Sequence, residues 1–396
     1  MLADYLTNKL DFFNKDIVSE YEDAFAKKAG TRHAFAFSAG RMGLYSILEA
    51  LDIGPGDEVI VPAFTCVVVP NAILYRGAKP VYVDVDPKTF NIDVSGVEKV
   101  ITNKTRALCA QHTFGLICDI DELKALGAKH KITVIEDSAH ALGASWKEQS
   151  VGSLSEVAFF STDHSKVIST LYGGMVTTND DSLAERIKVI RDGSPFLSER
   201  QLKKICLTFL FGFPLFRPNL YWLGWSLYRV AYKLGFTFRF DDELKTNKPD
   251  GYPFPAKLSA FQAKLGLSQL QNLDQNLKHR RRLGLELEKR FHWLGEKAPE
   301  DKSNHSFLRY SFLVKDRKKF VNHLRLNFEL GIWFESIAHG RKSKLDKIGY
   351  RIGSCPIAEK VVRHIVNLPT HESIDIEFLL KKLDKFNDKI CDNLKF

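Results

Sequence analysis

The sequence is poor in the residue patterns that mark metal and redox chemistry. Its 396 residues include six cysteines, but these form no C-x-x-C pair and no cluster with histidines, so a zinc site or a dithiol redox motif is disfavoured. The motifs G-x-G-x-x-G, G-x-x-x-x-G-K-S/T, G-x-S-x-G and H-E-x-x-H are also absent. The chain therefore lacks the signatures of a Rossmann dinucleotide site, a P-loop, an α/β-hydrolase and a zinc metalloprotease.

Long apolar runs are missing as well. No uninterrupted apolar stretch reaches the ~20 residues that a membrane-spanning helix needs, and Met1–Lys15 carries Asp and Lys where a signal peptide has its apolar core. We therefore expect a cytoplasmic protein. The composition is that of a folded globular chain, with 44% hydrophobic and 27% charged residues. The net charge of +9 favours anionic partners, such as phosphorylated small molecules, nucleic acid or lipid headgroups.

What the sequence does contain, from about Phe35 to Asn179, is an alternation of short β-branched or aromatic runs with segments of helical spacing, such as Gly40–Leu51 and Asp121–His130. This alternation predicts βαβ units and a largely parallel sheet, which is an α/β fold class. The predicted strands are Glu58–Val61, Pro80–Val85, Ala107–Gln111, Thr133–Glu136, Val157–Ser161 and Gly174–Thr178. Ligands of such sheets bind at the carboxyl ends of the strands.

The remainder of the chain mixes short strands with amphipathic helices, which predicts a smaller C-terminal α+β domain over residues 251–396, after a large domain over residues 1–250. The elements expected there include the strand Tyr310–Val314 and the helices Lys318–Leu330 and Ile376–Lys389. A basic run, Lys278–Arg282, ends another helix. Such runs are typical of solvated helix faces, so we expect no nucleic-acid partner.

Aromatic residues are concentrated between Pro195 and Phe240, where 13 of the 46 in the chain occur. Within this segment, residues 220–233 have the composition of an interfacial helix, with leucines and aromatics beside Arg229 and Lys233. Two interpretations stay open: a buried lid or subunit contact, which is the commoner case, and a peripheral membrane contact through residues 203–240. Both hold if they concern different faces.

Four short pieces lie at predicted strand ends or helix starts, and each alone has an ordinary explanation. A helix often begins with Ser and Gly, an Asp after a strand is often an N-cap, and a single Lys is usually a surface residue. Their combination and order are unusual. The pieces are Ser38–Gly43, Ile135–His140, Phe159–Lys166 and the pair Gly173-Gly174.

Together these pieces predict a pocket for pyridoxal phosphate. The aldehyde of this cofactor must be held by a lysine amine, its ring nitrogen needs an anionic partner, and its phosphate needs several N–H and O–H donors. Lys166 can supply the amine and Asp137 the carboxylate. Gly40, at a helix start, and Ser161 can supply the phosphate donors.

With these residues the chain resembles the DegT/StrS-type sugar aminotransferases, which are fold-type I pyridoxal phosphate enzymes. The resemblance covers most of the chain. It rests on the four pieces above and on further stretches, among them Gly56–Pro62, Gly77–Val81, Val151–Leu154, Gln262–Leu267, Cys355–Lys360 and Val366–Thr370. It implies an aspartate-aminotransferase-like large domain with a mixed, mostly parallel sheet, and a homodimer with sites at the subunit interface.

The resemblance also implies roles for single residues. Lys166 corresponds to the lysine that forms the imine, and Asp137 to the partner of the ring nitrogen; these are the expected catalytic residues. Ser161, with Gly40 and Arg41 at the helix start, would bind the phosphate. His140 stands where the family often has Gln, near the ring hydroxyl, and a charge on it would make the cofactor pH-sensitive. Cys66 would pack near the ring.

Two departures from the family pattern concern the partner subunit and the substrate entrance. Family members usually carry an Asn in a Gly-Tyr-Asn stretch that reaches the partner's phosphate, whereas Gly251-Tyr252 is followed here by Pro253. That donor is missing or is replaced by Lys257 or Lys264. The second departure is the aromatic-rich segment 195–250, which is longer than the usual connection.

The expected activity is a ping-pong transamination from an amino acid, usually glutamate in this family, to a keto-sugar, typically nucleotide-linked, for cell-surface polysaccharide or related glycan synthesis. Two alternatives stay open. In dehydratases on the same scaffold a His replaces the imine-forming lysine, so Lys166 favours transamination, although His164 lies close by in the sequence. The other alternative is a sensor or scaffold that binds the cofactor without turnover.

Overall fold

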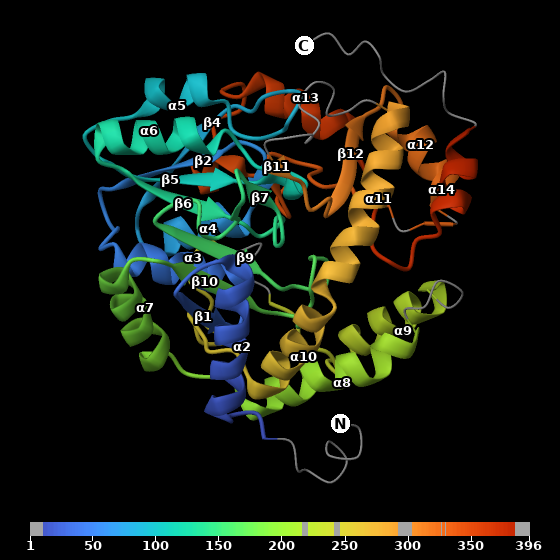
Figure 1. Ribbon diagram of the computed structural model, residues 1–396, viewed down its shortest axis with the longest axis horizontal. Helices are drawn as coiled ribbons and strands as arrows, with labels where there is room; N and C mark the ends of the chain where they lie inside the picture. Colours follow the sequence, from blue (N-terminus) through green and yellow to red (C-terminus); the bar gives the residue numbers. More distant parts are fainter. Residues whose placement is uncertain are drawn as a thin grey trace.

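A computed structural model gives the structure of residues 11–215, 221–240, 246–291, 303–325, 327–328 and 330–384. Its centre is a seven-stranded sheet in the order β1-β10-β9-β6-β5-β2-β4 (Figure 1). The strands are β1 (His33–Phe37), β2 (Glu58–Pro62), β4 (Lys79–Val83), β5 (Thr105–Gln111), β6 (Thr133–Asp137), β9 (Val157–Ser161) and β10 (Gly174–Thr178). The five strands from β9 to β4 are mutually parallel, and β10 and β1 join antiparallel at one edge. The predicted mixed, mostly parallel sheet is confirmed, and all six predicted strands are present.

Helices cover both faces of the sheet. Successive residues of each strand point to opposite sides, so the apolar residues of one strand pack against the helices on both faces. In β2, for example, Val59 and Val61 pack into one core cluster while Ile60 packs into the other. One face is covered by α3 (Gly40–Ala50), α4 (Val68–Tyr75) and α7 (Asp181–Gly193), and the other by α2 (Lys15–Ala29), α5 (Val94–Val100), α6 (Ile120–His130) and α10 (Ala260–Gln271).

The C-terminal part is built around the antiparallel pair β12 (Arg309–Leu313) and β14 (Ile365–Pro369). The apolar residues of this pair form a core with α11 (Leu273–Phe291), α12 (Arg317–Leu324) and α14 (Ile376–Leu383). In Figure 1, α11 runs from α10 to this C-terminal layer. The helix expected over Lys318–Leu330 ends at Leu324, and residues 385–389 of the last predicted helix lie outside the described residues.

Short elements of the C-terminal part also reach the first half of the chain. β13 (Ala338–His339) pairs in parallel with β3 (Thr65–Cys66), and β11 (Ser303–Asn304) joins the hairpin of β7 (Ser145–Trp146) and β8 (Gln149–Ser150). The structure also contains α13 (Pro356–His364) and the 3-10 turns η1 (Thr113–Gly115) and η4 (Leu345–Ile348). The division into domains 1–250 and 251–396 stays a prediction.

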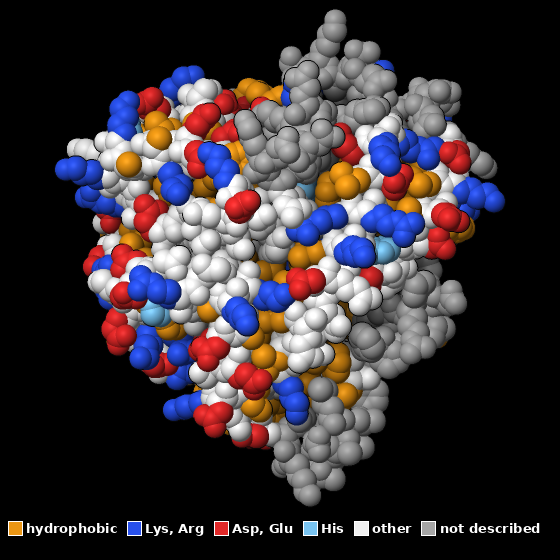
Figure 2. All heavy atoms as spheres, in the orientation of Figure 1, with side chains coloured by type: hydrophobic (Ala, Val, Ile, Leu, Met, Phe, Trp, Pro, Cys, Tyr) orange, Lys and Arg blue, Asp and Glu red, His pale blue; other side chains and the backbone are white. Residues whose placement is uncertain are grey.

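The aromatic-rich segment forms two helices, α8 (Glu199–Leu215) and α9 (Tyr221–Lys233), which pack against each other at the periphery of the molecule (Figure 1). Within the described ranges, no helix combines the length and apolarity needed to cross a bilayer. On the face shown in Figure 2, acidic and basic side chains are interspersed over most of the surface. The positive charge surplus is therefore not gathered into one basic band on that face.

Candidate active site

A cavity of about 280 Å³ lies at the carboxyl ends of β5, β6 and β9, where a parallel sheet binds its ligands. The last residues of these strands, Gln111, Asp137 and Ser161, all line it. Segments from the C-terminal part, carrying Trp333 and His339, complete the wall. The residues that the sequence singles out as site residues all line this one cavity: Gly40, Arg41, Cys66, Asp137, His140, Ser161 and Lys166.

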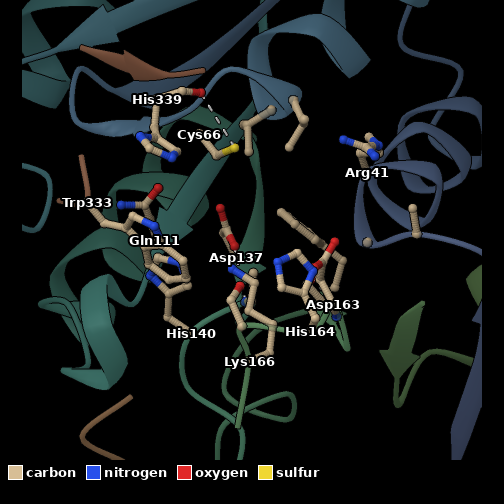
Figure 3. A pocket seen from close by; sticks show the side chains of 18 of the residues that line it. Arg41, Cys66, Gln111, Asp137, His140, Asp163, His164, Lys166, Trp333 and His339 are labelled. Carbon is tan, nitrogen blue, oxygen red and sulfur yellow. Dashed lines mark hydrogen bonds and ion pairs between the residues drawn. The ribbon is translucent and has the colours of Figure 1, made fainter. Parts of the chain in front are cut away.

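The close view in Figure 3 shows how these side chains lie. The Asp137 carboxyl group and the Lys166 side chain occupy the middle of the cavity. His140, Gln111 and Trp333 lie together on one side of them, and Arg41 lies on the opposite side. The cavity thus has an amine and a carboxylate at its centre and a guanidinium group at one end.

Lys166 is held in the loop between β9 and β10, which folds back on itself. The loop is closed by backbone hydrogen bonds from Thr162 to Gly173 (2.9 Å) and from Thr170 to Thr162 (2.9 Å), and the Lys166 N–H donates to Asp163 (3.0 Å). Burial lowers the pKa of the Lys166 amine below its ordinary value, although Cys66, Asp163 and Asp137 oppose the shift. A larger share of neutral amine than in water follows, and neutral amine is the nucleophilic form.

Asp137 ends β6 and is 5% exposed. Burial raises the pKa of its carboxyl group to about 6, even though the Ala139 N–H, Lys166 and His112 favour the charged form. The Ala139 N–H donates to this carboxyl at 3.2 Å. The ordinary explanation of Asp137 as an N-cap thus accounts for one bond, and the carboxyl group remains directed into the cavity.

Glu136, the preceding residue, points to the other face of the sheet and is fully buried. Its carboxylate accepts hydrogen bonds from the N–H groups of Gly152 (2.9 Å), Leu154 (2.7 Å) and Ser155 (2.9 Å). The His112 ring nitrogen Nε2 lies 3.2 Å from the same carboxylate, and Nδ1 of that ring accepts from the Cys118 N–H. The proton of this imidazole is therefore assigned to Nε2. Glu136 fixes the end of β6, from which Asp137 enters the cavity.

His140 is stacked between Phe114 and Trp333, with ring centroids 5.7 Å and 5.6 Å away. Its Nδ1 accepts a hydrogen bond from the Phe114 N–H at 3.3 Å, which leaves the ring proton on Nε2. Burial holds the pKa of His140 well below its ordinary value, and Lys166, His339 and Arg309 add to the effect. The expectation that a charge on His140 would make the site pH-sensitive is therefore wrong: the ring is neutral near pH 7.

The start of α3 forms an anion-binding end of the cavity. Ala39 at the N-cap has no polar side-chain atom that could accept hydrogen bonds from the first N–H groups of the helix, so these groups are available to a ligand. The helix start lies against β9: a Cβ atom on Gly40 would come within 2.9 Å of the Phe160 carbonyl oxygen. This contact brings the N–H groups of α3 beside the Ser161 hydroxyl and the Arg41 side chain.

Other residues of this region have different tasks. The Ser38 hydroxyl donates to the Lys257 carbonyl at 2.5 Å, and so ties two segments together. The Lys257 amine donates to the Asp192 carbonyl at 2.8 Å. Cys66 lines the cavity, with its sulfur 3.8 Å from the His339 carbonyl oxygen. Which residue replaces the family's cross-subunit Asn stays open.

Several cavity residues were missed by the sequence reasoning. Gln111 ends a predicted strand and could have been found by the same rule as Asp137; its amide donates to the Phe64 carbonyl and the Thr113 hydroxyl, both at 2.9 Å. Asp163 forms an ion pair with the adjacent His164. Burial tends to raise the pKa of Asp163, but His164, Lys166 and Arg41 together hold it below its ordinary value. Trp333 and His339 carry no local sequence signal.

Comparison with known proteins identifies where such a site occurs. Residues 6–212 and 232–381 match the DegT/DnrJ/EryC1/StrS aminotransferase family. A GDP-perosamine synthase from Caulobacter vibrioides is 31% identical over 93% of this chain and 89% of its own length. A UDP-4-amino-4-deoxy-L-arabinose–oxoglutarate aminotransferase from Shewanella sediminis is 40% identical over 46% of this chain and 44% of its own.

Solved structures share the fold. A protein from Streptococcus pneumoniae, described as a sugar aminotransferase and solved in its pyridoxal phosphate form, superposes with a TM-score of 0.74. The two chains are 19% identical, and the match covers 98% of this chain and 95% of the other. The expected aminotransferase fold is therefore confirmed.

Proposed function

The chain belongs to the DegT/DnrJ/EryC1/StrS aminotransferase family and is a pyridoxal-phosphate-dependent sugar aminotransferase, and we propose that Lys166 and Asp137 are its catalytic pair. The observation that carries this assignment is that both side chains occupy the centre of one cavity whose far end is formed by a helix N-terminus. A carboxylate, an amine and an anion-binding end are the donor set that this cofactor requires.

The cavity residues fit the cofactor. The uncapped N–H groups at the start of α3, the Ser161 hydroxyl and Arg41 would hold the phosphate, and Asp137 would pair with the ring nitrogen. The Nε2–H of His140 can donate toward the ring hydroxyl. When bound, pyridoxal phosphate would supply an aldehyde carbon that accepts the amino group and a ring that withdraws electrons from the reacting carbon.

Each residue then has a definite task in transamination. The Lys166 Nζ, whose pKa is lowered by burial, would hold the cofactor and, once released from it, would accept the proton from the substrate carbon that bears the nitrogen. Asp137 would pair with the ring nitrogen, and the positive charge of that nitrogen would favour the Asp137 carboxylate over its protonated form. The Trp333, His140 and Phe334 rings line the cavity together with the amine, and the Trp333 ring lies over Nζ.

The proposed substrates are glutamate and a nucleotide-linked keto-sugar, with the product used in cell-surface polysaccharide or related glycan synthesis. Two relatives support this: the names of both describe enzymes that make amino sugars linked to GDP or UDP, and one of those names includes oxoglutarate. Arg41 and Arg239 line the cavity and suit anionic groups. A homodimer and a cytoplasmic location are further parts of this proposal.

A glutamate half-reaction tests the proposal. The purified protein, loaded with pyridoxal phosphate, is mixed with glutamate, and the cofactor spectrum and released 2-oxoglutarate are followed together. We expect conversion of the bound cofactor to its amino form, with one 2-oxoglutarate per site. Binding without conversion, by glutamate or by other amino acids, would identify a scaffold. Conversion followed by loss of a sugar hydroxyl, with no amino sugar formed, would identify a dehydratase.

A further inference from the structure

The α9 helix and the turn after it expose an unusual amount of apolar surface. Of the eleven large apolar side chains that the described residues expose, six lie within residues 223–236. Their exposed fractions run from 46% to 66%, and they are Leu223, Leu227, Val230, Tyr232, Leu234 and Phe236. Single exposed apolar side chains are normal on a protein surface, but such a concentration marks an interaction surface.

Four of these residues form one stripe. Leu223, Leu227, Val230 and Leu234 follow one another at intervals of four, three and four residues, so they lie on the same side of a helix with 3.6 residues per turn. Gly224, which is buried, lies on a different side of the helix, and α9 packs against α8. We call Leu223, Leu227, Val230 and Leu234 the α9 stripe.

Positive charge borders the α9 stripe. Arg229 and Lys233, both exposed, lie four residues apart on one flank of it. Between Cys206 and Phe236 the sequence contains three basic residues and no Asp or Glu. An exposed apolar face flanked by cations, with no acidic residue in the segment, is the arrangement of a helix that lies in the interface of an anionic membrane.

The part of the chain that carries most of the stripe lies outside the match to the family model. The family match stops at residue 212 and resumes at residue 232, so Leu223, Leu227 and Val230 lie in the unmatched interval. The family model therefore does not describe this part of the chain. Its role is not explained by the chemistry that the family has in common.

We propose that the α9 stripe docks this enzyme on an anionic lipid surface, with the apolar side chains among the upper acyl chains and Arg229 and Lys233 at the headgroups. A second copy of the chain is the less suitable occupant. In a symmetric contact the same patch faces itself, and the sequence between Cys206 and Phe236 offers no Asp or Glu that could pair with Arg229 and Lys233 of the other copy. A lipid surface offers the opposite charge and an apolar layer at once.

The segment that follows α9 leads to the catalytic cavity. Only a few residues separate the end of α9 from Phe238 and Phe240, which form a buried aromatic group with Tyr172. The Tyr172 hydroxyl donates to the Phe238 carbonyl at 2.9 Å, and the Arg41 guanidinium lies 5.0 Å from the Phe240 ring centroid. The segment that follows α9 thus connects the proposed docking helix to Arg41, which lines the cavity.

Vesicle flotation of the intact protein tests this proposal without relying on catalysis. The probes are vesicles of phosphatidylcholine alone and of phosphatidylcholine mixed with phosphatidylglycerol. We expect binding to the mixed vesicles that weakens as salt rises, and weaker binding to phosphatidylcholine. Val230→Glu combined with Leu227→Glu should reduce the partition coefficient by about tenfold or more, because the charges would enter the apolar layer. The control is Val189→Glu on α7, which adds a glutamate outside the stripe at a site 65% exposed and should leave binding nearly unchanged.

A charge variant provides an independent measurement. Arg229→Gln with Lys233→Gln should remove the preference for phosphatidylglycerol while the far-ultraviolet spectrum and unfolding temperature stay the same. The proposal is overturned if the intact protein does not float with mixed vesicles at low salt, or if the Leu227/Val230 variant and the Val189 variant float equally. A native mass that falls in the Leu227/Val230 variant, without flotation of the intact protein, would assign the stripe to a second copy instead.

Discussion

The indole ring of Trp333 lies over the amine of Lys166, with 5.1 Å between the ring centroid and Nζ. The same ring has the Arg309 guanidinium at 5.2 Å and stacks against His140. An aromatic face attracts cations, so Trp333 favours the positions of the Lys166 and Arg309 side chains beside it. Because Trp333 and Arg309 come from the C-terminal part and Lys166 from the first half, neither part forms the site alone.

The central role of Lys166 leads to a first prediction. Lys166→Arg keeps a cation beneath Trp333 but cannot form an imine, so we expect turnover to fall by about 10³-fold or more while the fold is retained. Borohydride reduction of the loaded wild-type protein, followed by peptide mass spectrometry, should find the tag on Lys166. A tag on any other residue, or full activity in the Lys166→Arg variant, would remove this assignment.

A second prediction concerns the cost of burying Asp137 before the cofactor binds. The raised pKa of about 6, against an ordinary 3.8, means that the folded protein holds a proton here between about pH 4 and 6 that the unfolded chain has lost. Stability therefore decreases as pH rises through this window, by at most about 3 kcal/mol. Asp137→Asn should stabilise the cofactor-free protein at pH 7, and the gain should vanish below about pH 4.

Thermal unfolding of both proteins at several pH values measures this difference. Activity provides the matching functional readout, because the uncharged amide cannot keep the ring nitrogen protonated and turnover should fall by about 10²-fold or more. Equal unfolding temperatures for the two cofactor-free proteins across pH 4–8 would show that burial does not perturb Asp137.

Local sequence rules located the part of the site that the sheet supplies. Asp137 and Ser161 end strands whose hydrophobic runs are plain in the sequence, and Lys166 follows in the next loop. The rule that ligands bind at strand ends then brings them together without knowledge of side-chain contacts. The strand β1 was missed as a separate element, although its neighbour β10 was predicted with its observed bounds.

The other wall of the cavity depends on contacts between distant segments. His339 reaches the site because β13 pairs with β3, whose residues Thr65 and Cys66 are more than 270 positions earlier in the chain. A pairing that involves only two residues of each strand leaves no recognisable pattern in the sequence. The neutral state of His140 likewise follows from its burial between Phe114 and Trp333, which is a property of the packed structure.

The buried state of His140 yields a third prediction. Because burial holds its pKa well below the ordinary value of 6.5, the ring does not change charge between about pH 6.5 and 8. Replacement by the family's usual residue, His140→Gln, should therefore leave the shape of the pH–rate profile unchanged in this range. Loss of an acidic limb near pH 6.5 in this variant would show instead that His140 titrates during turnover.

A fourth prediction addresses the support beneath Asp137. Glu136→Gln keeps the size of the side chain but replaces one of the carboxylate oxygens with an NH₂ group. These two oxygens accept three backbone hydrogen bonds and contact His112. We expect a loss of stability of about 2–4 kcal/mol, because buried donors are left poorly satisfied. The exposed Glu156→Gln is the control and should unfold at the wild-type temperature. Comparable unfolding temperatures for both variants would contradict the proposed support.

The closest backbone approach in the site gives a fifth prediction. A Cβ atom on Gly174 would lie 2.4 Å from both the Cα and the N of Gly40, at the start of α3. Backbone atoms cannot rotate away as a side chain can, so Gly174→Ala must push α3 away from β10. We expect the free energy of unfolding to fall by about 2 kcal/mol or more. Gly193→Ala is the matched control, since no atom lies within 4 Å of the added Cβ and alanine favours the helical end of α7.

Because α3 also supplies the phosphate-binding N–H groups, the Gly174 variant should bind pyridoxal phosphate more weakly, whereas the Gly193 variant should bind it normally. A Gly174→Ala protein with wild-type stability and cofactor affinity would show that the helix start is not held in place by this contact.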